Sequence, residues 1–167
     1  RVLDRVEGAR LLLKGAAFGH DRARGRLTSV LGDRVEFLGR TPRFEDHLAT
    51  YRRVHVALDP MPYNGTTTTC EALLMGVPVV TCPGQTHAAR VGASLLEASG
   101  MVEGLASDED DYVDRAVACL DLAMSGAGTR DERRARFESS SLRDEAGHAS
   151  AVADALRHMW HLRLEQR

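Results

Sequence analysis

Short apolar segments alternate with helix-like segments through the first half of the chain, and this alternation restricts the fold more than any other feature. The apolar segments read as strands buried on both faces and cover residues 9–15, 34–39, 54–59 and 77–81. Helical patterns lie between them, over residues 21–31, 43–53 and 67–75. Strands that alternate with helices over short links form parallel sheets. The sequence therefore predicts an α/β fold, with a Rossmann-like parallel sheet flanked by helices.

The second half of the chain predicts helices only. They cover residues 87–99, 108–124, 130–138 and 149–164. Trp160 is expected to pack the last of these helices onto the rest of the protein. With 167 residues, 43% of them hydrophobic, the chain is long enough for one ordinary core. We therefore predict a single domain over residues 1–167 with a helical C-terminal part.

Charge and cysteine content exclude several classes of partner. The chain has 24 acidic and 22 basic residues, so no strong field favours nucleic acid or an anionic membrane. Its 3 cysteines show neither the even number nor the spacing of a disulfide framework or zinc site. No apolar run approaches the roughly 20 residues that span a bilayer. We expect a cytoplasmic protein whose function depends on a local site.

The segment DPMPYNGTTTTCEALL offers such a site, because four threonines, Thr66 to Thr69, stand where a helix begins. Asn64 and Gly65 precede them and tolerate positive φ, which allows a sharp turn and close approach to a ligand. The first turn of a helix has unpaired N–H groups and a positive dipole end. A diphosphate suits this array of donors. No cluster of carboxylates or histidines flanks the loop, so we expect binding without a metal.

Glu71 lies about one turn into the same helix, where its carboxylate could hold the hydroxyls of a ribose. A purely structural alternative is that Thr66 or Thr67 caps the helix and Glu71 completes a capping box. A capping box needs only one threonine, and four of them lower helix propensity in the first turn. The surplus favours ligand binding, although the pattern alone leaves both interpretations open.

Three further polar residues lie near the predicted carboxyl edge of the sheet. His47 could contact a base or phosphate, although a lone histidine on an amphipathic helix is more often a boundary residue. His87 and Arg90, in GQTHAARVG, could reach the distal part of a ligand or could be ordinary features of a helix start.

The segments HLATYRRVHVALDPMPYNGTTTTCEALLMGVPVVTCPG and HAARVGASLL resemble glycosyltransferase family 41, the protein O-GlcNAc transferases and their bacterial and plant relatives. The similarity continues through DEDDYVDRAVACL and the C-terminal helix. The resemblance implies the C-terminal lobe of a GT-B glycosyltransferase, with the sugar nucleotide bound between two Rossmann-like lobes. It also implies that the N-terminal lobe and tetratricopeptide repeats of such an enzyme lie outside this chain.

Carried onto matching positions, the resemblance implies that Thr66, Thr67 and Thr68 bind the diphosphate of UDP and that Glu71 holds the ribose. A histidine stands at the Thr66 position in the animal enzymes, and an aspartate at the Glu71 position. The bacterial and plant pattern has TTTTCE, as here. The difference leaves GlcNAc, fucose and glucose open as donor sugars.

The resemblance also places His47 beside the uracil and phosphates, and the backbone near Pro42 and Arg43 at the uracil edge. The implied reaction is an inverting, metal-independent transfer of a sugar, GlcNAc from UDP-GlcNAc foremost, to Ser or Thr hydroxyls of proteins. No residue of this chain is assigned as catalytic base, and the lobe alone is expected to be inactive. The alternatives are a non-catalytic nucleotide-binding or interaction module, and a GT-B enzyme acting on a small molecule or an envelope glycan.

Overall fold

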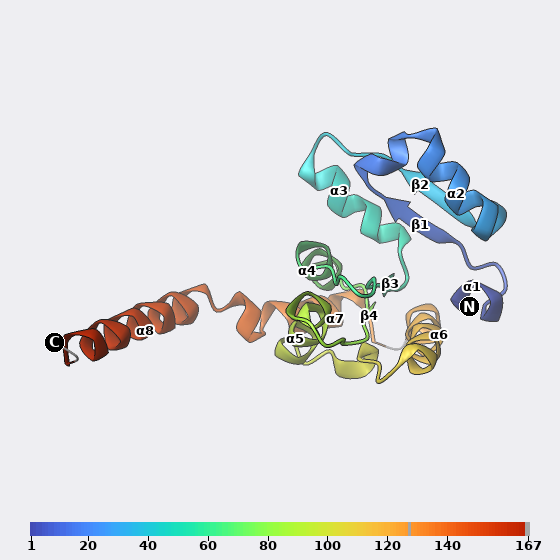
Figure 1. Cartoon of the computed structure of the whole chain (residues 1–167). Helices are drawn as coiled ribbons and strands as arrows, with labels where there is room; N and C mark the ends of the chain where they lie inside the picture. The colour runs from blue at the N-terminus through green and yellow to red at the C-terminus, as the bar shows by residue number, and fades with distance from the viewer. Residues whose placement is uncertain (127, 166–167) are drawn as a thin grey trace.

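The N-terminal part of the protein is built on one pair of parallel strands. The computed structural model describes residues 1–126 and 128–165 (Figure 1). A short helix α1 (Val2–Arg5) leads to β1 (Leu11–Lys14), and α2 (Asp21–Leu31) connects β1 to β2 (Val35–Leu38). The two strands pair in parallel with Leu11 opposite Val35. Helix α3 (Phe44–Thr50) then carries the chain toward the second strand pair.

A second parallel pair, β3 (Ala57–Leu58) and β4 (Val79–Val80), organises the rest of the protein around α4 (Thr67–Leu74). The helices that follow are α5 (Val91–Ala98), α6 (Glu109–Ser125), α7 (Arg130–Glu138) and α8 (Glu145–Glu165). Short 3-10 helices link the elements: η1 (Ala16–Gly19), η2 (Gly32–Arg34), η3 (Tyr51–Arg53), η4 (His87–Ala89), η5 (Val102–Gly104) and η6 (Ser141–Arg143). One further parallel bridge joins Thr81 to Leu105 beside β4.

The predicted α/β class with parallel strands is confirmed, but the strands form two separate pairs. Figure 1 shows the β1–β2 pair lying apart from the β3–β4 pair. A cavity of about 730 Å³ separates them, lined by Leu12 and Leu13 of β1 and by Ala57 and Leu58 of β3. Polar residues from the carboxyl ends of these strands also border the cavity, so it opens onto the predicted site.

The main hydrophobic core lies under α4, where burial of apolar surface stabilises the second strand pair. Its buried members are Ala72, Leu73, Val77, Val79, Leu96, Met101 and Phe137. A second cluster joins α6 to the other face of β4 through Val80, Cys82, Ala106, Tyr112, Ala116 and Cys119. The first cluster holds α4 against β4, α5 and α7, and the second holds β4 against α6.

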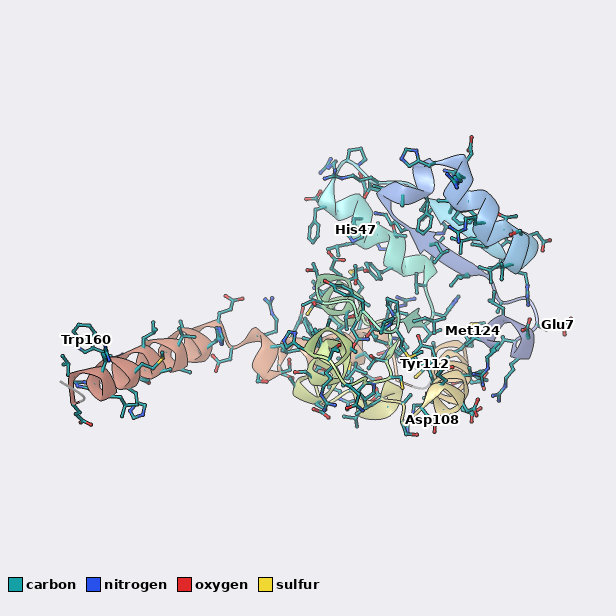
Figure 2. The ribbon with its side chains drawn as sticks, viewed as in Figure 1. Glu7, His47, Asp108, Tyr112, Met124 and Trp160 are labelled. Atoms are coloured by element: carbon teal, nitrogen blue, oxygen red, sulfur yellow. The ribbon has the colours of Figure 1, made fainter. Side chains whose placement is uncertain are left out.

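Helix α8 does not pack as predicted. It begins at Glu145, four residues before the expected start, and it contains no buried residue. Trp160 is 64% exposed and lies on the part of α8 that projects from the body of the protein (Figure 2). The expectation that Trp160 anchors the helix is therefore wrong, because no partner surface faces it within the part of the chain that the structure describes.

Most predicted helices are confirmed, whereas strand lengths differ. Helices α2 and α7 have the predicted bounds, and the helix expected over residues 87–99 divides into η4 and α5 at Arg90. Strands β3 and β4 have only two residues each, because few residues of each segment face a partner strand. None of the helices in residues 1–126 and 128–165 is long and apolar enough to cross a bilayer.

Candidate functional site

The N-terminus of α4 presents three threonine side chains to solvent. Thr66 is the N-cap, and Thr67 and Thr68 form the first turn; all three are exposed. Thr66 makes no side-chain capping hydrogen bond, so the capping-box alternative is not realised. The N–H groups of the first turn and the three hydroxyls thus remain available to an anion at the positive end of the helix dipole.

Thr69 has a different role from the three threonines before it. It is 4% exposed, and its hydroxyl donates a hydrogen bond of 2.9 Å to the carbonyl oxygen of Gly65. Gly65 does not adopt positive φ, so the expectation that the turn uses a positive φ at this glycine is wrong. The observed reason is space, because a Cβ at Gly65 would lie 3.1 Å from Thr69 Oγ1 and would overlap Thr68 Oγ1.

A buried carboxylate holds the loop that precedes α4. Asp59 follows β3 and is 4% exposed. Its Oδ1 accepts a 2.7 Å hydrogen bond from the N–H of Gly65, and its Oδ2 accepts one of 2.7 Å from the Thr81 hydroxyl. Burial raises the pKa of Asp59, while the two hydrogen bonds oppose that rise. Asp59 therefore fixes the start of α4 relative to β4.

Asn64 ties the same loop to the start of α5. Its side chain donates to the carbonyl of Pro60 at 3.0 Å and accepts from the N–H of Gly92 at 3.2 Å. The N–H of Asn64 also donates to the carbonyl of Ala88, at 2.9 Å. Asn64 is 2% exposed, and its bond to the N–H of Gly92 is buried and therefore shielded from water.

Glu71 lies one turn beyond the threonines, and neighbouring side chains hold its carboxylate. Its Oε2 lies 2.8 Å from Nε2 of His47 and accepts a 3.2 Å hydrogen bond from the Tyr51 hydroxyl. The Tyr51 hydroxyl is also 3.2 Å from the carbonyl oxygen of Thr68. Burial, and then the charge of Glu71, raises the pKa of Tyr51, so this phenol stays a donor. The carboxylate is thereby oriented before any ligand arrives.

His47 occupies the centre of this group, on α3 (Figure 2). Its Nδ1 lies 2.7 Å from Nζ of Lys14 at the end of β1, and its ring makes an edge contact with Tyr51. The side chain of His47 is 24% exposed, so one part of the ring faces solvent. The structure thus brings together His47 and Glu71, which are 24 residues apart in the sequence.

The remaining predicted residues lie at the borders of the site. Pro42 and Arg43 are exposed and directly precede α3; Arg43 is its N-cap. His87 is exposed in η4, next to Ala88, which contacts the loop before α4. The Arg90 guanidinium lies 3.4 Å from the carbonyl of Gly84, so its predicted ligand contact stays a prediction. Across residues 1–126 and 128–165, no group of three or more His, Cys, Asp or Glu residues lies in a metal-binding arrangement.

Four residues of this arrangement were not predicted from the sequence. Tyr51 lies in the segment predicted as a helix over residues 43–53 and was given no part in the site, yet its hydroxyl contacts Glu71. Asp59 and Thr81 end the predicted apolar segments 54–59 and 77–81, and Lys14 is the last residue but one of the segment 9–15. The carboxyl ends of parallel strands meet at one edge of a sheet, so a polar residue at such an end is the signal that could have identified these three.

Comparison with protein families identifies a family that this chain matches. The family model described as Glycosyl transferase family 41 matches residues 11–143, which contain both strand pairs, α4 and the site residues described above.

The chain is also similar to curated proteins from plants. A probable UDP-N-acetylglucosamine–peptide N-acetylglucosaminyltransferase SPINDLY of Petunia hybrida is 37% identical over 166 residues, which is 96% of this chain and 18% of that protein. The protein of the same name from Solanum lycopersicum has the same identity and coverage. The chain therefore spans about a fifth of the length of these relatives.

A solved structure has a similar fold. The K341M mutant of the Thermobaculum terrenum O-GlcNAc transferase superposes with a TM-score of 0.86 at 36% identity. The match covers 95% of this chain and 32% of that one. The match therefore extends over nearly the whole chain.

Proposed function

The chain belongs to glycosyl transferase family 41, and we propose that it is the donor-binding C-terminal lobe of an inverting GT-B glycosyltransferase. The enzyme would move a sugar, GlcNAc from UDP-GlcNAc, to Ser and Thr hydroxyls of proteins. The names of the similar plant proteins, probable UDP-N-acetylglucosamine–peptide N-acetylglucosaminyltransferases, support a nucleotide-sugar donor and a protein acceptor. This chain matches only 18% of the length of those proteins, which supports the proposal that it is one lobe of a longer enzyme.

One observation carries the proposal: three exposed threonines surround the N-terminus of α4, and a carboxylate held in place lies one turn away. In the proposed complex, Thr66, Thr67 and Thr68 bind the diphosphate together with the N–H groups of the first turn. Glu71 accepts hydrogen bonds from the ribose hydroxyls. Diphosphate and ribose are neighbouring parts of one nucleotide, which matches the neighbouring positions of the two groups on α4.

The chemistry of this lobe would be electrostatic. In an inverting transfer the acceptor oxygen attacks the anomeric carbon while the bond to the diphosphate breaks, so negative charge grows on the leaving group. The hydroxyl and N–H donors at the start of α4 would stabilise that charge in the transition state. We propose that this lobe binds the diphosphate without a metal ion. No side chain of the chain is proposed as the base that deprotonates the acceptor.

The base of the nucleotide would lie on the α3 side of the site. His47 already contacts the carboxylate of Glu71, the proposed ribose ligand, and this contact supports a position of His47 beside uracil. Pro42 and Arg43, at the exposed start of α3, are proposed to contact the uracil edge through their backbone. The N-terminal lobe and tetratricopeptide repeats of the enzyme are proposed to lie outside this chain. We propose a cytoplasmic location, which the three free cysteines support.

Calorimetric titration of the chain with UDP, GDP and uridine tests the proposal. UDP is expected to bind more tightly than uridine, because only UDP uses the N-terminus of α4. Thr67→Val is expected to lower the affinity for UDP about fivefold, which is the effect of losing one hydrogen bond, and to leave the affinity for uridine unchanged. Glu71→Gln is expected to weaken both ligands, because both contain the ribose.

Thr86→Val is the matched control, because Thr86 is exposed and makes no capping hydrogen bond. This variant should bind UDP like the wild type. Equal affinities of the wild type for UDP and uridine, or affinities that neither site substitution changes, would contradict the assignment. Binding of GDP as tight as that of UDP would refute the preference for uracil.

A further inference from the structure

Lys14 is the only lysine of the chain, and the proposed function gives it no role. It ends β1 and is half-buried. Its Nζ lies 2.7 Å from Nδ1 of His47 and 3.2 Å from the hydroxyl oxygen of Thr41. A lysine ammonium has three donors and no acceptor, so it must donate in both contacts. Nδ1 of His47 is therefore the accepting nitrogen, which means that it has no proton.

This contact decides where the His47 ring proton resides. A neutral imidazole has one protonated and one accepting nitrogen, and the partner of one nitrogen fixes the state of the other. With Nδ1 accepting from Lys14, the proton is on Nε2. Nε2 lies 2.8 Å from Oε2 of Glu71, so His47 donates to that carboxylate. The three side chains form one directed chain of hydrogen bonds from Lys14 to Glu71.

The chain of hydrogen bonds has a consequence for Glu71. Oε2 accepts from both His47 and Tyr51, which occupies that oxygen. Among the described residues, every buried side-chain nitrogen or oxygen atom has a hydrogen-bond partner. Oε1 of Glu71 has no hydrogen bond to these residues, so Oε1 is not buried and is the oxygen that faces solvent. A carboxylate held through one oxygen presents the other in a fixed direction. A ribose hydroxyl would meet that oxygen already oriented.

We propose that Lys14 is a positioning residue of the donor site: it fixes the Nε2–H tautomer of His47, which in turn orients Glu71 toward the ribose. The inference rests on the proposed role of Glu71 in nucleotide binding. The chain of hydrogen bonds links β1, which belongs to the first strand pair, to α4, which packs against the second strand pair. Lys14 thus acts across the boundary between the two strand pairs without touching the nucleotide.

Nitrogen-15 NMR of the histidine rings tests the first step directly. Two-bond correlations distinguish the Nε2–H from the Nδ1–H tautomer, and His47 should show Nε2–H in the wild type. Lys14→Met should introduce a clear population of Nδ1–H, and Lys14→Arg should restore the wild-type state. Thr41→Val is the matched control, because it removes the other partner of Lys14 and should leave the tautomer unchanged. An unchanged His47 tautomer in Lys14→Met would overturn the proposal.

Ligand binding tests the second step and separates positioning from direct contact. Lys14→Met is expected to weaken uridine five- to tenfold, about the effect of one misplaced hydrogen bond, without changing the affinity for inorganic pyrophosphate. An equal loss for pyrophosphate would show that Lys14 binds phosphate directly and would refute positioning. If the wild type binds neither uridine nor UDP, the proposed function and the positioning role both fail. The tautomer measurement still decides whether Lys14 orients His47.

Discussion

Replacing Thr81 with valine removes one hydroxyl from the buried cluster that holds the loop before α4. Thr81 is fully buried, and its hydroxyl donates a 2.7 Å hydrogen bond to Oδ2 of Asp59. Valine has nearly the same shape, so the change creates no cavity. The backbone of residue 81 keeps its bonds to Gly104 and Ala106, which the side chain does not affect. The substitution therefore isolates the loss of one hydrogen bond to a buried carboxylate.

The expected cost follows from that isolation. A hydrogen bond to a charged group contributes about 1.5–3 kcal/mol to the free energy of unfolding, and loss of the donor leaves Oδ2 of Asp59 buried without a partner. For a chain of this length, about 2 kcal/mol corresponds to a fall in Tm of about 4–8 °C. The Thr81 bond also lowers the pKa of Asp59 against the effect of burial, so the variant should raise that pKa further.

The raised pKa gives the prediction a second signature. The pKa of Asp59 in the folded protein lies above its unfolded value, so the native state takes up the proton first as pH falls. Acidification through the folded pKa therefore relieves the cost of burying the charge. Because this cost is larger in the variant, the stability difference between Thr81→Val and the wild type should be largest at neutral pH and should shrink in acid.

Urea unfolding followed by circular dichroism, at neutral and at acidic pH, measures both effects. Thr86→Val makes the same chemical change at an exposed position and should leave stability within about 0.5 kcal/mol of the wild type. The reasoning would be refuted by a neutral-pH cost for Thr81→Val no larger than that of the control. A cost that grew on acidification would also refute it, because it would place the raised pKa on another group.

Four further changes have defined outcomes in thermal unfolding. Gly92→Ala would place a Cβ against Oδ2 of Asp59 and should lower the free energy of unfolding by about 1–3 kcal/mol. Gly25→Ala, on the open face of α2, should raise it by roughly 0.5–1 kcal/mol. Equal effects of the two substitutions would contradict the close packing of Gly92 against Asp59. Leu73→Ala should cost about 2–5 kcal/mol, because Leu73 is fully buried on the core-facing side of α4. A cost under about 1 kcal/mol would be inconsistent with that core. Truncation after Asp144 should change the free energy of unfolding by less than about 0.5 kcal/mol, because α8 contains no buried residue. A large fall in Tm on truncation would contradict this exposed position of α8.

Local sequence signals predicted the elements well where the stabilising interactions are themselves local. Helix α7 has its predicted bounds because Thr129 and Glu132 form a capping box at its start. Helix α2 ends at Leu31, before Gly32, which adopts the positive φ typical of a helix end. Strand lengths were predicted poorly, because a strand exists only where another strand pairs with it. The apolar segment 54–59 therefore contributes only two residues to the pair with β4.

In the candidate site, too, local features were predicted and contacts between distant residues were not. The placement of Thr66, Thr67 and Thr68 at the start of α4 is confirmed, because the turn and the helix are adjacent in the sequence. The partners of Glu71 could not be predicted, since His47 and Tyr51 lie 24 and 20 residues away, in α3 and η3. No periodicity relates these positions to Glu71.

The sequence by itself determined the alternation of strands and helices, the family, and the position of three threonines at a helix start. These depend on turn residues, apolar periodicity and hydrogen bonds between near neighbours. Only the tertiary structure decided that the strands form two pairs, that Thr69 and Asp59 support the loop, and that Trp160 stays exposed. It also decided that Lys14, His47 and Glu71 form one chain of hydrogen bonds. The physical reason is distance along the chain, because such contacts arise only when separate elements pack together.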